Sequence, residues 1–166
     1  GASAGAVTVT VAQADTTSLS EAAQALVGDR PVYQFSVTSG ATAISSLGGT
    51  ATVSIPYTPA EGEDLNAIVL YYVRDDGSLE TVINGRYDAE AGAVVFTTTH
   101  FSDYAVGYNK VGFTDVADSA WYADAVSYLA ARGVTGGTTA TIFSPDATLT
   151  RGQFVTLLLK LMTLRR

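Results

Sequence analysis

The only histidine of this chain, His100, stands two positions before Ser102 in the stretch TTTHFSDYAV. An imidazole that accepts the proton of a hydroxyl group makes the oxygen a nucleophile, so His100 and Ser102 could be a base and the nucleophile that it activates. This chemistry requires the histidine nitrogen within about 2.6 to 3.2 Å of the serine oxygen. One hypothesis is therefore a catalytic pair of His100 and Ser102.

An ordinary β-strand explains the same residues without any chemistry. In a straight strand, side chains two residues apart share a face but are attached roughly 6.5 Å apart, so this chemistry requires a sharp bend at Phe101. In the strand interpretation Phe101 fills the core, His100 bonds a backbone carbonyl or a nearby threonine, and Ser102 with Asp103 forms a polar turn. We adopt this interpretation and predict a protein that is not an enzyme. The alternative is self-cleavage: the tripeptide His100-Phe101-Ser102 resembles the self-cleavage point of certain eukaryotic β-rich domains, which implies attack of Ser102 on the carbonyl of Phe101 in an N-to-O acyl shift.

The composition limits which other chemistry is open to the chain. Its 166 residues, 47% of them hydrophobic, are enough for one medium domain or two small ones with a real core. With a single histidine and no cysteine, neither a thiolate nor a histidine-based metal cluster can form. The acidic stretches 61–64 and 74–78 lack the regular spacing of a calcium loop and are predicted to be solvated turns. We therefore predict no metal site and no cofactor.

The charged residues are distributed unevenly along the chain, whose net charge is −7. Residues 1–109 hold 12 acidic and 3 basic side chains, whereas residues 110–166 hold 4 acidic and 6 basic ones. This shift predicts two modules, 1–109 and 110–166. An acidic body argues against a nucleic acid partner, because phosphates need clustered lysine and arginine. The longest apolar run, 67–73, is far shorter than the roughly 20 residues of a membrane-spanning helix, so we predict no membrane span.

The first module has the pattern of a protein built from short strands. Alternating or β-branched stretches between turn residues predict strands at 7–13, 31–37, 50–57 and 67–73. The last of these has no polar face and is expected at the centre of a sheet, covered on both sides. A stretch of helical composition, 18–28, predicts a short connecting helix that ends at Gly28. This module is predicted to be an antiparallel β-sandwich.

Two amphipathic helices are predicted in the second module. The first covers residues 119–133, with Ser119 or Asp118 as N-cap, an end at Gly133, and an apolar face of Trp121, Ala125 and Leu129. The second begins at Thr150, where Thr150 and Gln153 form a capping box, and its apolar stripe consists of Phe154, Leu157, Leu158 and Leu161. The predicted fold class is therefore α+β, an antiparallel β-sandwich followed by a helix-loop-helix unit.

Residues 113–161 carry a series of short motifs: Phe113-Thr114-Asp115-Val116, Trp121, Ala125-Val126, Leu129, Gly133-Val134, Phe143-Ser144-Pro145, Leu149-Thr150-Arg151, Phe154 and Val155. In order and spacing this segment closely resembles the S-layer homology repeat of bacterial cell-surface proteins. The resemblance implies a helix-loop-helix repeat, normally one of three around a pseudo-threefold axis. It also implies non-covalent attachment to secondary cell-wall polysaccharide, often through a pyruvate ketal on a sugar. The family tetrad Thr-Arg-Ala-Glu is replaced here by Thr150-Arg151-Gly152-Gln153.

The resemblance and the local chemistry indicate three ligand-binding residues, Arg151, Thr150 and Trp121. A helix amino terminus carries partial positive charge and free N–H groups, and Arg151 adds a planar fork that fits the carboxylate of a ketal. Trp121 offers an apolar platform for a sugar ring, with its indole N–H as a donor. The plain alternatives are an ion pair of Arg151 with Asp115 or Asp146, and a core position for Trp121.

We predict a non-enzymatic, extracellular protein of the bacterial cell envelope or S-layer whose partner is a pyruvylated cell-wall polysaccharide. The β-sandwich is predicted to be a spacer or interaction domain, with an adhesin or glycan-binding module as a further alternative. A unit of about 55 residues is near the lower limit for burying its own core. Its apolar stripe is therefore expected to pack on further S-layer homology repeats, on other copies of the chain or on the β-sandwich. If the binding groove forms between repeats, as the resemblance implies, a single repeat would hold only part of a site.

Overall fold

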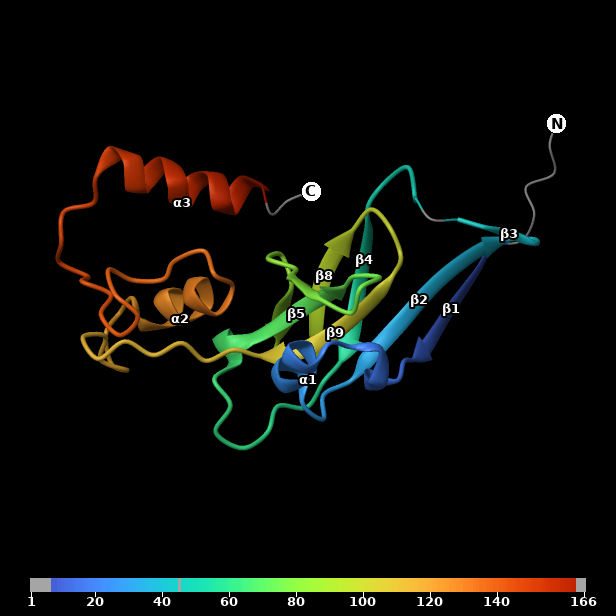
Figure 1. Ribbon diagram of the computed structural model, residues 1–166, viewed down its shortest axis with the longest axis horizontal. Coiled ribbons are helices and arrows are strands. Elements are labelled where there is room, and N and C mark those ends of the chain that lie inside the picture. Colours follow the sequence, from blue (N-terminus) through green and yellow to red (C-terminus); the bar gives the residue numbers. More distant parts are fainter. Residues whose placement is uncertain (1–6, 45, 164–166) are drawn as a thin grey trace.

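The computed structural model describes residues 7–44 and 46–163, which form a β-rich body and a helical C-terminal part (Figure 1). We call residues 7–109 the β-module and residues 110–163 the C-terminal segment. The β-strands are β1 (Val7–Gln13), β2 (Val32–Ser39), β3 (Thr42–Ala43), β4 (Ala51–Pro56), β5 (Ile68–Val73), β6 (Leu79–Thr81), β7 (Arg86–Asp88), β8 (Ala93–Thr98) and β9 (Asp103–Tyr108). The helices are α1 (Glu21–Val27), α2 (Ala123–Ala131) and α3 (Arg151–Thr163), with 3-10 turns η1 (Thr16–Ser18) and η2 (Leu65–Ala67).

The strands form two antiparallel sheets. The larger sheet has the order β1-β2-β9-β5-β6, with β3 paired to β2, and the smaller has the order β4-β8-β7. The strands predicted at 7–13, 31–37, 50–57 and 67–73 correspond to β1, β2, β4 and β5. The module is thus a sandwich-like arrangement within an α+β protein, as the spacing of strands and turns predicts.

The core between the two sheets is built from alternate residues of their strands. Phe35, Leu70 and Tyr104 of the larger sheet meet Val94 and Phe96 of the smaller sheet in one buried cluster. The tyrosine and Phe96 rings lie 4.6 Å apart. This alternation follows from the period of two along a strand, which sends successive side chains to opposite faces.

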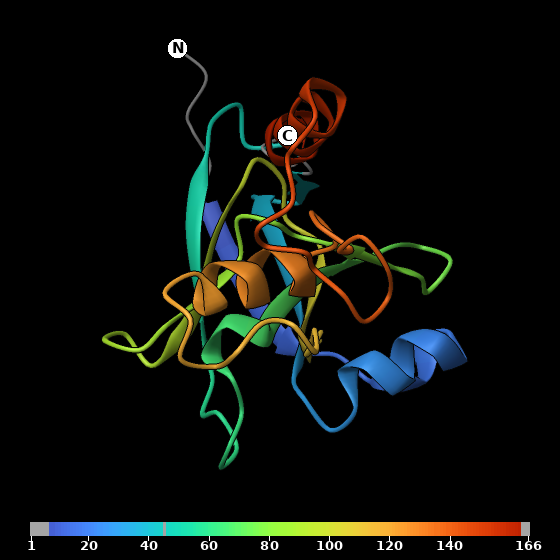
Figure 2. The same cartoon turned by 90° about the vertical axis from the view of Figure 1, so that its left-hand side faces the viewer.

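The outer face of the larger sheet has a second core, which α1 covers. Leu19, Ala23 and Val27 pack against Val69 and Tyr71 of β5, whose neighbouring residues point into the first core. Strand β5 is therefore buried on both faces, as its lack of polar residues predicts. Figure 2 shows α1 on the side of the sheet that faces away from the smaller sheet.

Helix α2 ends where the sequence predicts but begins later and buries a different face. Gly133 adopts φ +68°, and the amides of Gly133 and Val134 donate to the carbonyls of Ala130 and Leu129, which closes the helix. The predicted N-caps are wrong: the N-cap is Tyr122, without a side-chain cap bond. Two successive turns, in which the amides of Ala120 and Ala123 donate to the carbonyls of Ala117 and Ala120, delay the helix start.

The predicted apolar face of Trp121, Ala125 and Leu129 is also wrong. Trp121 lies before the helix and Ala125 is exposed, whereas Val126, Ser127, Ala130 and Ala131 are buried. The reason is that α2 is covered from two sides, by the loops of its own segment and by the β-module. A single stripe cannot represent a helix with two covered sides.

Helix α3 lies apart from the sandwich, above α2 in the view of Figure 1. Its apolar side chains Phe154, Val155, Leu158, Leu159, Leu161 and Met162 are between 40% and 59% exposed. The ammonium group of Lys160 donates to the carbonyls of Gly133 and Val134 and joins α3 to the end of α2. The stripe of α3 is therefore not buried against the β-module, so this one of the three expected packing modes does not apply to α3.

Candidate functional site

The amino terminus of α3 is organised by Thr150 and Gln153. The amide of Gln153 donates to the Thr150 hydroxyl oxygen, while the Gln153 side-chain oxygen accepts from the amide and hydroxyl of Thr150 at 2.9 and 3.0 Å. The capping box predicted from the sequence is confirmed. Because both functions of the Thr150 hydroxyl are used in the cap, this residue holds the helix start in position.

Arg151 is the first residue of α3, and its side chain is exposed. Within the described part of the chain, its guanidinium group has no hydrogen bond or ion pair, and neither Asp115 nor Asp146 pairs with it. The alternative of an internal ion pair is therefore wrong. The guanidinium and the amino terminus of the helix both present positive charge to solvent, which suits a carboxylate ligand.

Asp115 has a different task, which is to hold the loop that precedes α3. Its carboxylate accepts the amide hydrogens of Phe143 at 2.8 Å and of Ser144 at 2.7 Å. These backbone bonds, that of Phe143 first, lower the pKa of Asp115. Ser144 adopts φ 62°, a backbone conformation that residues other than glycine rarely adopt. Its hydroxyl group forms a hydrogen bond with that of Thr138. The loop conformation that leads to Arg151 is thus fixed by a carboxylate of the segment.

Trp121 is 93% exposed, so its alternative as a core residue is wrong. Its indole ring meets the ring of Tyr122 edge to face, with 5.5 Å between the centroids. None of the contacts in the described residues joins Trp121 to Thr150 or Arg151. The structure therefore brings Thr150 and Arg151 together at one helix end and leaves Trp121 as a separate exposed aromatic surface before α2.

His100 and Ser102 lie in the bend between β8 and β9. The His100 ring packs edge to face on the Tyr72 ring, with 5.5 Å between the ring centroids. The backbone carbonyl of His100 accepts from the Thr98 hydroxyl at 2.7 Å. The carbonyl of Ser102 accepts from the amide of Phe35. In the described residues no hydrogen bond joins the side chains of His100 and Ser102. Phe101 packs partly buried on the inner core, as the strand interpretation predicts.

A buried arginine at the junction between the two parts of the molecule was not anticipated. Arg132 follows α2 directly and is only 3% exposed. Its guanidinium donates to the carbonyls of Gly85, Asn66 and Ile68 in the β-module, at 2.7, 2.9 and 3.0 Å, and to Tyr128 in α2 at 3.2 Å. Burial lowers its pKa from the ordinary range of a guanidinium. A cation at a helix carboxyl terminus is usually solvated, so the sequence contains no signal for this role.

Gly85 is required at this junction by close approach. A Cβ atom at Gly85 would lie 2.7 Å from the Cβ of Leu70, closer than two carbon atoms can pack. The absence of a side chain lets the Gly85 backbone lie over β5, where its carbonyl meets Arg132. The Arg132 guanidinium also stacks over the Tyr128 ring, 3.6 Å from its centroid.

A polar cluster adds to the junction between α2 and the β-module. Asp64, the N-cap of η2, accepts from the ammonium group of Lys110 and from the Ser127 hydroxyl at 2.7 Å. Burial raises the pKa of Asp64, but the bonds from Lys110 and Ser127 outweigh it and leave the pKa below its usual value. The Asn109 amide donates to the carbonyl of Ala131 at 2.6 Å.

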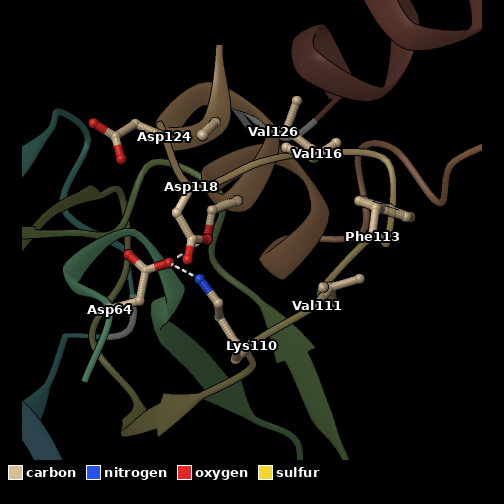
Figure 3. A pocket seen from close by; sticks show the side chains of 11 residues that line it. Asp64, Lys110, Val111, Phe113, Val116, Asp118, Asp124 and Val126 are labelled. Atoms are coloured by element: carbon tan, nitrogen blue, oxygen red, sulfur yellow. Dashed lines mark hydrogen bonds and ion pairs between the residues drawn. The ribbon is translucent and has the colours of Figure 1, made fainter. Parts of the chain in front are cut away.

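A cavity of about 280 Å³ opens beside this cluster (Figure 3). Its polar side holds Asp64, Lys110 and Asp118, and its apolar side holds Phe113 and Val126. No group of three or more acidic, histidine or cysteine side chains in residues 7–44 and 46–163 is arranged to hold a metal ion. In the same residues, no helix has the length and hydrophobicity to cross a bilayer.

The comparisons with known proteins concern both parts of the chain. The S-layer homology domain family matches residues 112–155. An amylopullulanase of Thermoanaerobacterium thermosulfurigenes is 29% identical over 126 residues, which represent 74% of this chain and 7% of that protein. That stretch is longer than the part of the chain after Val111, so it also includes residues of the β-module. No solved structure matches the chain significantly. Residues 112–155 are therefore an S-layer homology domain segment, which indicates anchoring at the cell surface.

Proposed function

We propose that this chain is the wall-binding part of an extracellular protein and that its S-layer homology segment contributes to a site for pyruvylated secondary cell-wall polysaccharide. In this proposal α2, the following loop and α3 are the helix-loop-helix repeat of the family. The β-module serves as a spacer or interaction domain beside it. The observation that carries the proposal is the exposed guanidinium of Arg151 at the first position of α3, which has no ion-pair partner among the described residues.

The charge arrangement at α3 supports an anionic ligand. The first amides of the helix and the Arg151 guanidinium present positive charge in a chain of net charge −7. A ketal carboxylate is planar and can take two parallel N–H bonds from a guanidinium, which is stronger and more directional than a bond from an ammonium group. Thr150 supports this geometry through its capping box with Gln153.

Trp121 supports the carbohydrate class of the proposed ligand. An indole ring that is 93% exposed has an unfavourable contact with water that a sugar face would remove. Its position apart from Arg151 agrees with a site assembled from more than one repeat, in which each repeat contributes a different surface. A chain with one repeat would then bind weakly.

The exposed stripe of α3 supports packing against further S-layer homology repeats or other copies of the chain. Six large apolar side chains of one helix remain largely in contact with solvent. Monomeric proteins seldom leave such a contiguous apolar surface uncovered. The proposed partner surfaces are therefore the polysaccharide at the amino end of α3 and a protein surface along its length.

Sedimentation with purified bacterial cell walls tests the ligand. Walls that retain the pyruvate ketals should bind the full-length protein with all its repeats, and walls stripped of ketals should not. Arg151→Ala should weaken binding by about ten-fold or more, since a bidentate charged pair contributes about 1.5 to 3 kcal/mol. Arg74→Ala, which removes an exposed arginine of the β-module, is the matched control. Equal binding to both kinds of wall would refute the proposed ligand.

A further inference from the structure

The S-layer homology segment buries too little by itself to explain its fold. Its own core cluster consists of three buried residues, Phe113, Val126 and Ala130, with partly buried neighbours around them. A segment of this size near the lower limit of stable domains needs additional burial from elsewhere. The remaining buried residues of α2 obtain that burial from the β-module.

Ala131 belongs to the outer core of the β-module. It is 2% exposed and packs in the same cluster as Val27, Val69 and Tyr71. The core that α1 forms on the larger sheet is thus continued by the last turn of α2. Removing the β-module would expose this face of the helix to water.

Arg132 makes the two parts depend on one another for hydrogen bonding. A guanidinium taken out of water is costly unless its donors are satisfied, and three of its four carbonyl acceptors belong to Asn66, Ile68 and Gly85. The same carbonyls would in turn lose their buried donors without Arg132. Each part therefore supplies hydrogen-bond partners for buried polar groups of the other part.

We propose that the β-module is a cap for the S-layer homology segment: it covers the face of α2 that the segment cannot cover, and the segment holds its fold only when docked on it. Repeat units that stack need a terminal cap with one covered and one polar face, and the β-module supplies such a cap. Within the described part of the segment, the apolar helix face that stays uncovered is then that of α3. The consequence for wall anchoring rests on the proposed function, whereas the cap itself does not.

Hydrogen exchange of the full chain, without any polysaccharide, tests the cap. Arg132→Met keeps the length of the side chain but removes its N–H donors. We expect the amides of α2 and of the 135–149 loop to exchange about 100-fold faster, because a buried charged network is lost, while β4 and β8 change far less. Arg86→Met, the same substitution at the exposed neighbour of Gly85, should stay within about two-fold of the wild type.

A milder variant decides the question if Arg132→Met does not fold. Ser127→Ala with Asn109→Ala removes the bonds to Asp64 and to the carbonyl of Ala131 without burying a new polar group. The α2 amides should then exchange about ten-fold faster or more, since each bond contributes about 1 kcal/mol. If the amides of α2 in the folded variants exchange at rates within about two-fold of the wild type, the proposal that the β-module is a cap is refuted. That result would leave the polysaccharide proposal untouched, because no ligand is present.

Discussion

The hydroxyl group of Ser127 donates to Oδ2 of Asp64 at 2.7 Å, so a helix of the S-layer homology segment is bonded to the turn that precedes β5. The same carboxylate accepts from the ammonium group of Lys110 and, through Oδ1, from the amide of Asn66 at 2.9 Å. One acidic side chain therefore joins three parts of the chain. Its ionisation links the junction to pH.

The junction should weaken in acid. The folded pKa of Asp64 lies below its unfolded value of about 3.9, so its contribution to stability is complete above that value and is lost as the pH falls through the folded pKa. The urea concentration at the unfolding midpoint of the wild type should decrease as the pH falls through that range. In Asp64→Asn this decrease should be smaller. Asp75→Asn, an exposed aspartate of the β5–β6 turn, should keep the wild-type slope. An unchanged slope in Asp64→Asn would contradict this role.

Gly152 should be replaceable with a gain in stability. It occupies the first turn of α3 without a positive φ, and an added Cβ would meet only the Thr150 hydroxyl oxygen at 4.0 Å. Gly152→Ala should stabilise α3 by about 0.5 to 1 kcal/mol, measured as slower amide exchange in the helix. Gly133→Ala is the opposite case, because φ +68° costs an L-residue roughly 1 to 2 kcal/mol. The two substitutions should therefore change stability in opposite directions.

Trp121 should contribute to binding and not to stability. Because it is 93% exposed, Trp121→Ala should change the free energy of unfolding by less than about 0.5 kcal/mol. Phe113→Ala, at 7% exposure, should cost about 3 kcal/mol in the same measurement. In the wall sedimentation experiment the Trp121 variant should bind less. A large loss of stability on Trp121→Ala would show that the indole is packed in solution.

The α3 stripe should drive association of the chain when no other repeat covers it. The weight-average mass from sedimentation equilibrium should rise with concentration in the wild type. Leu158→Glu places a charge in the stripe and should hold the protein at the monomer mass. Thr156→Glu adds the same charge on the opposite side of α3 and should associate like the wild type. Association of Leu158→Glu at the wild-type level would exclude the stripe as the contact.

The chain should remain intact between Phe101 and Ser102. The His100 ring is engaged with Tyr72, and the backbone on either side of the bond is held by Thr98 and Phe35. Intact-mass spectrometry after prolonged incubation should therefore show a single uncleaved species. Two fragments that divide at this bond, and that disappear in Ser102→Ala, would support the self-cleavage alternative.

Signals confined to a few neighbouring residues predict much of this molecule. The alternation in β1 and β4, the end of α1 at Gly28, the end of α2 at Gly133 and the capping box at Thr150 all depend on dihedral angles and bonds within one turn or strand. The motif residues of the S-layer homology segment are likewise visible in order and spacing. For this reason the sequence alone indicates the resemblance to the family and places Thr150 and Arg151 at the start of a helix.

The surfaces that α2 buries depend on contacts between residues far apart in the chain. Trp121 was expected on the apolar face of a helix and lies in solvent, because two different partners cover α2 and neither partner covers the turn before it. Arg132 is buried because carbonyl groups of Asn66, Ile68 and Gly85 converge on it across the junction. Backbone carbonyls carry no sequence signature, so the convergence that buries this charge appears only once the sheets and helices are assembled.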